Sequence, residues 1–196
     1  MKRVPLSLVS TALIALTPAA VLAHAGSDLG SHHFAGGFVH PFTGLDHIVA
    51  MVAVGLWSAQ LGGRARWSVP LAFLMMMITG GLLAASHVAL PFVESSILAS
   101  ALIIGLLLLF ALRVPTVAAV ALAGMFAVFH GSAHVAEMPV NASAASYATG
   151  FVAASAILLA TGSVVGNLLA TTMRQPLWLR ACGGAVTAAA LLIAVA

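Results

Sequence analysis

Histidine is the residue type in this chain whose number and spacing point to chemistry. Eight histidines stand against seven lysines and arginines and four acidic residues, in a chain of 196 residues. Four of the histidines fall in two short segments, 40–47 and 129–137, each of which also contains an acidic residue. Neutral imidazole suits nickel, copper, zinc and cobalt, whereas magnesium and calcium prefer oxygen ligands. The residue types therefore point to transition-metal binding.

The first segment reads HPFTGLDH over residues 40–47. On a helix, residues seven positions apart lie nearly on one stripe, so His40 and His47 would share a face, with Asp46 beside them. Asp46 could bind a metal itself or accept a hydrogen bond that orients a histidine. We therefore predict His40, Asp46 and His47 as metal ligands or their immediate support.

The second segment reads FHGSAHVAE over residues 129–137. Spacings of four and then three residues place His130, His134 and Glu137 on one face of a helix. Such a face can chelate a divalent ion without distorting the backbone. Gly131 leaves room for a neighbouring helix or for the path of the ion. We predict His130, His134 and Glu137 as the second half of the metal site.

The chain that must position these groups is strongly apolar, with 62% hydrophobic and 6% charged residues. A soluble domain has about 25% charged residues, so this composition excludes a cytosolic globular enzyme and a disordered chain. The lysines and arginines are not clustered as a nucleic-acid surface requires. The single cysteine, Cys182, excludes a disulfide within one chain. We predict an all-α integral membrane protein.

Residues 1–23 have the pattern of a cleavable signal peptide. Lys2 and Arg3 precede an apolar stretch over 4–16, and small residues lead to a cleavage site after Ala23. The alternative is an uncleaved first helix, because the apolar stretch extended to Ala23 is just long enough to span a bilayer. In both cases the residues that follow lie outside the cytoplasm.

Residues 24–37 are rich in glycine, serine and histidine and show no apolar period, so we expect a polar periplasmic tail. Its histidines, His24, His32 and His33, are weaker metal candidates that could capture ions at the mouth of a pore. The alternative, which we favour, is a flexible, solvated tail without a metal role. His87, near the expected periplasmic end of the second span, is a further weaker candidate.

Six apolar segments follow, each close to the length of about 20 residues that crosses about 30 Å of hydrocarbon. They cover residues 38–61, 68–90, 95–112, 115–138, 144–172 and 177–196. We therefore predict that residues 38–196 form one bundle of six transmembrane helices. Glycines such as Gly80, Gly162 and Gly183 should let neighbouring helices approach closely.

The arginines predict the orientation of this bundle. Beyond residue 23 they are Arg64, Arg66, Arg113, Arg174 and Arg180. All five lie in or beside alternate connections, whereas the other two connections carry or adjoin Glu94 and Glu137. Positive residues concentrate in cytoplasmic loops. We expect a multi-pass protein of the bacterial inner membrane, with both termini of the mature chain in the periplasm.

In this topology the two histidine segments lie at similar depth. At about 1.5 Å per residue, His47 lies about 13 Å below the periplasmic start of the first span. His130 lies about 12 Å below the periplasmic end of the fourth span by the same measure. We therefore expect the two segments to meet and form one site in the periplasmic half of the membrane.

Together the two segments resemble the signatures of the HupE/UreJ family of membrane proteins. Residues 40–47 look like its H-x5-D-H signature, and residues 129–137 resemble its second motif, F-H-G-x-A-H followed by a glutamate. Val135 departs from the glycine expected in many relatives, which alters helix packing there but removes no ligand. The resemblance implies a nickel permease that supplies hydrogenase or urease maturation, with some relatives associated with cobalt.

We expect Ni²⁺ or Co²⁺ as the transported ion, with no permanently bound cofactor and no enzymatic activity. No G-x-x-x-x-G-K-[ST] motif occurs, so the chain itself does not hydrolyse ATP. The expected partners are the metal ion and the lipid bilayer, and no nucleic acid. The sequence leaves open whether the chain forms a homo-oligomer and whether transport is coupled to protons.

Three other readings of the histidines remain at this point. An intramembrane metal-dependent hydrolase would use them and Asp46 to hold zinc and an activated water, although the H-E-x-x-H signature is absent. A bis-histidine haem protein is a second alternative. In the third, the histidines are polar contacts between helices, satisfied by carbonyl groups.

Overall fold

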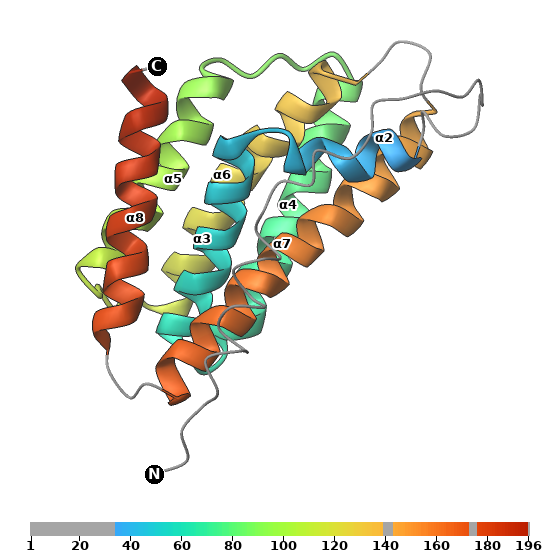
Figure 1. The fold of residues 1–196 in the computed structure, drawn as a ribbon. Helices are drawn as coiled ribbons and strands as arrows, with labels where there is room; N and C mark the ends of the chain where they lie inside the picture. The colour runs from blue at the N-terminus through green and yellow to red at the C-terminus, as the bar shows by residue number, and fades with distance from the viewer. Residues whose placement is uncertain (1–33, 139–142, 173–175, 196) are drawn as a thin grey trace, which may run out of the picture.

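The computed structural model describes residues 34–138, 143–172 and 176–195. The expected signal peptide and His24, His32 and His33 lie outside the described residues. Within these ranges every regular element is helical (Figure 1). The elements are α2 (Phe34–Val39), η1 (His40–Phe42), α3 (Leu45–Leu61), α4 (Ala65–Ala85), α5 (Val93–Leu109), α6 (Thr116–Ala136), α7 (Ala144–Thr172) and α8 (Pro176–Val195).

Each of the six apolar segments overlaps one of the long helices, α3 to α8, with helix starts up to three residues earlier than the segment in α4, α5 and α8. Among the described residues, α4, α6, α7 and α8 are long and apolar enough to cross a membrane. The bent pair of α2–η1 and α3 makes a fifth candidate span if it counts as one. Helix α5 is apolar but has 17 residues, which is about 26 Å. The structure therefore shows an all-helical, multi-pass membrane protein with four or five candidate spans, and six spans stay a prediction.

The first apolar segment is not one continuous helix, contrary to our expectation for residues 38–61. The chain bends by 79° between η1 and α3. Pro41 lies in η1, and because proline has no backbone N–H it cannot donate an α-helical hydrogen bond. Both the backbone N–H and the hydroxyl of Thr43 donate hydrogen bonds to the carbonyl of His40, at 3.0 and 2.7 Å. His40 and His47 therefore do not share one helical stripe, and they approach each other across a bend.

The residues before the bend are also helical. We placed residues 34–37 in an irregular polar tail, but they form the first turn of α2. Helix α2 packs against the start of α7, where Gly37 lies against the carbonyl of Tyr147 and Gly150 lies against the carbonyl of Phe34. These two glycines allow the backbones to approach more closely than side chains would permit. The contact holds α2 across one end of the bundle (Figure 1).

Close glycine contacts also join the long helices, as the sequence predicts. In the α4–α6 pair, Gly80 lies against the carbonyl of Val128, and Gly131 lies against the carbonyl of Met77. In the α3–α7 pair, a Cβ on Gly162 would come within 3.1 Å of the Cα of Gly55. The α5–α8 pair uses Gly183 against Leu109 in the same way. Gly131 therefore serves helix packing, one of the two roles that we considered for it.

Helix α3 is the central helix, between α7 on one side and α5 and α8 on the other (Figure 1). Its Met51 and Trp57 are fully buried, and Phe73 of α4 packs into the same apolar core. In contrast, α4 exposes Leu71 and Leu82 on its outer side. This distribution suits a helix bundle whose outer surface faces lipid.

Candidate metal site

The first turn of α3 carries a hydrogen-bonded pair of side chains, Asp46 and His47. Asp46 Oδ1 lies 2.8 Å from His47 Nδ1. A carboxylate only accepts hydrogen bonds, so Nδ1 carries a proton, and in the neutral ring Nε2 then has the lone pair. His47 is buried, and its Nε2 has no hydrogen-bond partner in the protein. Asp46, at the positive end of a helix dipole, thus orients His47 and leaves Nε2 ready to bind a cation.

Gly44 makes room for this pair, and our sequence analysis missed its role. It is the N-cap residue of α3 in an extended conformation. A Cβ at Gly44 would lie 2.7 Å from both Asp46 Oδ1 and His47 Nδ1. No larger residue fits there without displacing the pair. The only signal in the sequence was a glycine inside the motif, two residues before Asp46.

His130 of α6 has the same arrangement as His47 with a different acceptor. Its Nδ1 donates a hydrogen bond to the carbonyl of Phe126 at 2.9 Å, which is one turn earlier in the helix. The side chain is fully buried, and Nε2 has no partner in the protein. The rings of His47 and His130 are 5.8 Å apart between centroids. Two imidazoles from distant segments thus present free Nε2 atoms to one small region.

His134 lies at the centre of the cluster. Its ring centroid is 4.4 Å from that of His47 and 4.9 Å from that of His40. It is buried, and neither ring nitrogen has a hydrogen-bond partner in the protein. Its Nδ1 is 3.9 Å from Glu137 Oε2, which is beyond hydrogen-bond distance but close enough for electrostatic attraction.

His40 and Glu137 form the outer edge of the cluster. His40 Nε2 and Glu137 Oε2 are 2.8 Å apart, which ties η1 to the C-terminal end of α6. Their side chains are 25% and 46% exposed, so this pair is accessible where the other histidines are not. His40, His134 and Glu137 each offer one potential ligand atom, and these three atoms lie within 4.8 Å of one another. These three residues could hold a metal ion together.

The site therefore has two layers. We call His40, Glu137 and His134 the outer layer, and His47, His130 and His134 the inner layer, with Asp46 supporting His47. The two sequence motifs meet as predicted. The centroids of neighbouring rings among His40, His47, His130 and His134 are 4.4–6.4 Å apart. That these six residues bind a metal stays a prediction.

Aromatic rings form the apolar wall of the cluster. The ring centroid of Phe151 is 3.9 Å from that of His134, and Tyr147, one turn earlier on α7, is 6.0 Å from His40. On the inner side, Phe73 is 5.3 Å from His130. The sequence analysis missed all three, because only the tertiary packing of α4 and α7 brings them to the histidines.

Comparison with known proteins agrees with these motifs. A protein-family model described as HupE / UreJ protein matches residues 11–193, a range that contains both histidine segments. The chain belongs to the HupE/UreJ family. It is also similar to "Protein HupE" of Rhizobium leguminosarum bv. viciae, with 42% identity over 189 residues that cover 95% of this chain and 98% of that protein. No solved structure matches the chain.

One predicted candidate of this HupE/UreJ chain lies away from the cluster. His87 follows the end of α4, is exposed, and has a left-handed backbone conformation with φ of 62°. The structure does not bring its ring to the other histidines. His87 is therefore a natural control position, because it is a histidine of the same chain outside both layers.

Proposed function

We propose that this chain is a permease that carries Ni²⁺, or Co²⁺, from the periplasm to the cytoplasm for hydrogenase or urease metal-centre assembly. One observation carries the proposal. Four buried ring nitrogens of the cluster have no hydrogen-bond partner in the protein: His47 Nε2, His130 Nε2, His134 Nδ1 and His134 Nε2. Leaving a buried polar atom unpaired costs about 1–3 kcal/mol. A transition-metal cation would remove this cost at each nitrogen that carries a lone pair, because imidazole lone pairs are its preferred ligands. In neutral His134 that is one of the two ring nitrogens, since the other carries the proton.

The outer layer would receive the ion. Glu137 and His40 are partly exposed, so a hydrated cation meets the carboxylate before it loses its water ligands. His40 Nε2 carries the proton of its hydrogen bond to Glu137, because the carboxylate accepts. Binding of the ion by Nε2 and the carboxylate would replace this hydrogen bond and release the proton to water. The charges of Glu137 and Asp46 would offset part of the cost of moving a divalent cation into a region of low dielectric constant.

His134 would pass the ion from the outer layer to the inner layer. It belongs to both layers, and its two ring nitrogens are free of hydrogen bonds within the protein. Beyond the inner layer, Phe73 and Met51 are fully buried in the apolar core. The path to the opposite side is closed in this conformation, so transport requires these side chains to move.

The membrane potential would supply a driving force for this direction. For a divalent cation the potential favours inward movement by about 4.6 kcal/mol per 100 mV. This force acts without any nucleotide hydrolysis by the chain. The proposed orientation, with the cluster on the periplasmic side, places the exposed layer where the external ion arrives.

Metal flux into proteoliposomes tests the proposal. The wild-type protein should accumulate radiolabelled nickel in the vesicles, and His47→Ala should lose nearly all of this flux. His87→Asn is the matched control, because it removes an imidazole outside the cluster and asparagine tolerates the left-handed backbone. An absorption spectrum of the same sample separates a haem protein from a permease. Absence of flux in a folded, metal-binding wild-type protein would favour the hydrolase alternative.

A further inference from the structure

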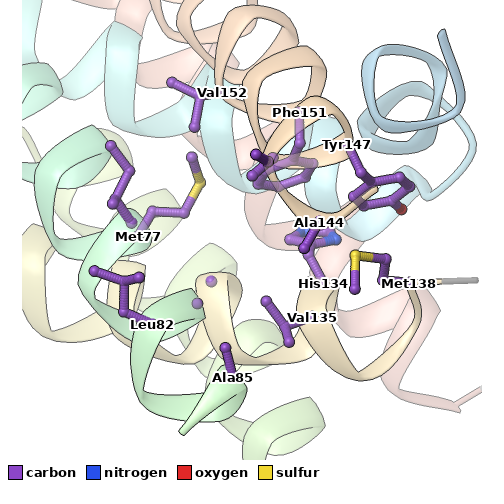
Figure 2. A pocket seen from close by; sticks show the side chains of 15 residues that line it. Met77, Leu82, Ala85, His134, Val135, Met138, Ala144, Tyr147, Phe151 and Val152 are labelled. Carbon is purple, nitrogen blue, oxygen red and sulfur yellow. The ribbon is translucent and has the colours of Figure 1, made fainter. Parts of the chain in front are cut away.

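An apolar pocket of about 350 Å³ opens between α4 and α7, next to His134 (Figure 2). Its lining residues come from α4, α6 and α7 and the residues just beyond α6: Met77, Ile78, Gly81, Leu82, Ala85, Gly131, His134, Val135, Met138, Ala144, Ala145, Tyr147, Ala148, Phe151 and Val152. Only two of these side chains, His134 and Tyr147, carry nitrogen or oxygen. The pocket therefore offers a hydrocarbon surface with the rear of the histidine cluster at one point of its wall.

The pocket opens toward the membrane. Ile78 and Leu82 on α4 and Ala148 on α7 line it and are also exposed on the outside of the bundle. Both helices are long and apolar enough to cross a bilayer. Along α4 the pocket runs from Met77 to Ala85, the last residue of the helix, which is about 12 Å. This length fits within one leaflet, whose hydrocarbon layer is about 15 Å thick.

Small residues leave the pocket unfilled by the side chains that the structure describes. Gly81 and Ala85 line it on α4, and Ala144 and Ala148 line it on α7. Elsewhere in this protein small residues bring helices into contact, as Gly80 does against α6. At Gly81, in contrast, a Cβ would meet only ordinary contacts of 3.4 Å or more. The small side chains here leave a gap between helices instead of a contact.

The geometry points to one acyl chain of a phospholipid as the occupant of this pocket, from the leaflet on the side of the histidine cluster. Water is a poor occupant, since a buried water needs two to four polar partners. A polar small molecule would need several convergent polar groups, which the lining lacks. An acyl chain makes apolar contacts with the whole lining. Lipid acyl chains also surround the outer surface of the bundle at that depth. This inference does not rest on the proposed function.

The acyl chain would complete the wall of the site. Phe151 covers part of the His134 ring, and the pocket reaches the same imidazole from the membrane side. A hydrocarbon chain there excludes water from the back of His134. The ring then stays poorly solvated and exposes its nitrogens only to the cluster.

Photo-crosslinking in nanodiscs tests the inference. The protein is reconstituted with phosphatidylcholine that carries a diazirine in the middle of one acyl chain, and labelled residues are mapped by mass spectrometry. Met77 and Tyr147 are the informative positions, because they are only 2% and 4% exposed and yet line the pocket. Strong labelling of both is the expected result. Labelling confined to exposed residues such as Leu71 would overturn the inference.

A matched pair of variants makes the test specific. Ala148→Phe should fill the pocket and abolish labelling of Met77, whereas Ala160→Phe should leave it unchanged. Both positions are exposed alanines of α7, but Ala160 does not line the pocket. Ala85→Leu fills the pocket from α4 and decides the question if Ala148→Phe does not fold. Unchanged labelling of Met77 in a folded pocket-filling variant, or a crosslink from the pocket to a second copy of the chain, would contradict an acyl chain as occupant.

Discussion

At the scale of single residues, the two inner histidines are oriented by different acceptors. His130 donates to a backbone carbonyl of its own helix, whereas His47 donates to the carboxylate of Asp46. Only the second acceptor carries a charge, and only the second can be changed by substitution. Acceptors of this kind fix the tautomer of a metal-binding histidine and raise its basicity. Asp46 is therefore the residue that best separates a metal role from a structural one.

Asp46→Asn should abolish most nickel uptake at low external nickel. The substitution preserves the size and an acceptor oxygen, so the hydrogen bond to His47 can persist while the negative charge is lost. Mutation of a residue that supports a metal-binding histidine typically lowers metal affinity by about 10–100-fold. Uptake of radiolabelled nickel, normalised to the amount of protein in the membrane, is the measurement. Wild-type uptake by this variant would mean that the negative charge of Asp46 has no role in transport.

Gly44→Ala should have an effect similar to that of Asp46→Asn. The added Cβ would lie 2.7 Å from both atoms of the Asp46–His47 pair, so the pair has to separate. Gly36→Ala is the matched control, because its Cβ would meet nothing closer than 3.9 Å. Nickel binding by isothermal titration should be weakened only in Gly44→Ala. Equal binding by the two folded variants would refute the positioning role of Gly44.

At the scale of the elements, the break between η1 and α3 determines the shape of the site. It turns His40 toward the end of α6, where it reaches Glu137, and it leaves His47 in the first turn of α3. The contact between α2 and α7 holds this arrangement through Gly37 and Gly150. The outer layer thus depends on how α2 packs, whereas the inner layer depends on α3 and α6.

Gly150→Val should therefore weaken the outer layer and spare the inner one. A side chain at Gly150 collides with the carbonyl of Phe34, so α2 and with it His40 must shift. Because the outer layer is proposed to bind the incoming ion and not to move it across the membrane, the KM for nickel should rise about tenfold with little change in the maximal rate. Thr149→Val, an exposed neighbour on α7, is the control. A fall in the maximal rate with unchanged KM would show that α2 acts in passage.

The sequence predicted the long helices better than it predicted the bend. Apolar segments separated by Arg64, Pro91 or Arg113 are readily recognised, and each overlaps a helix in the structure. The break at Gly44 was not predicted, because a glycine inside an apolar run is tolerated in helices and is a weak signal. Pro41 is also a weak signal for the bend, since proline is common in the first turn of a continuous helix. The aromatic wall depends on contacts between distant helices, which a single sequence does not reveal.

At the scale of the whole molecule, the polar cluster lies at one end of an otherwise apolar bundle. The partly exposed side chains of the cluster, His40, Asp46 and Glu137, are near that end, and the core around Trp57 closes the rest. Such an arrangement suits a protein that accepts its ion from one side of the membrane. Which side this is depends on the orientation that the arginines predict.

Cysteine accessibility tests this orientation. In a Cys182→Ser background, Ser95→Cys should react with a membrane-impermeant reagent added outside intact cells, whereas Leu112→Cys should react only after the cells are opened. Both positions are exposed, and they lie near opposite ends of α5. The reason for the prediction is the concentration of arginine on the side of Leu112. The reverse labelling pattern would invert the topology and the direction of transport.

The central claim is that the histidines of both layers bind the ion, and Ni K-edge X-ray absorption of the purified, nickel-loaded protein tests it most directly. His134 is the decisive residue because it belongs to both layers. The wild-type spectrum should show imidazole scattering from nitrogen ligands at about 2 Å. This signal should be strongly reduced in His134→Ala and unchanged in His87→Asn. An oxygen-only shell in the wild-type protein, or the same imidazole signal in His134→Ala, would contradict the account.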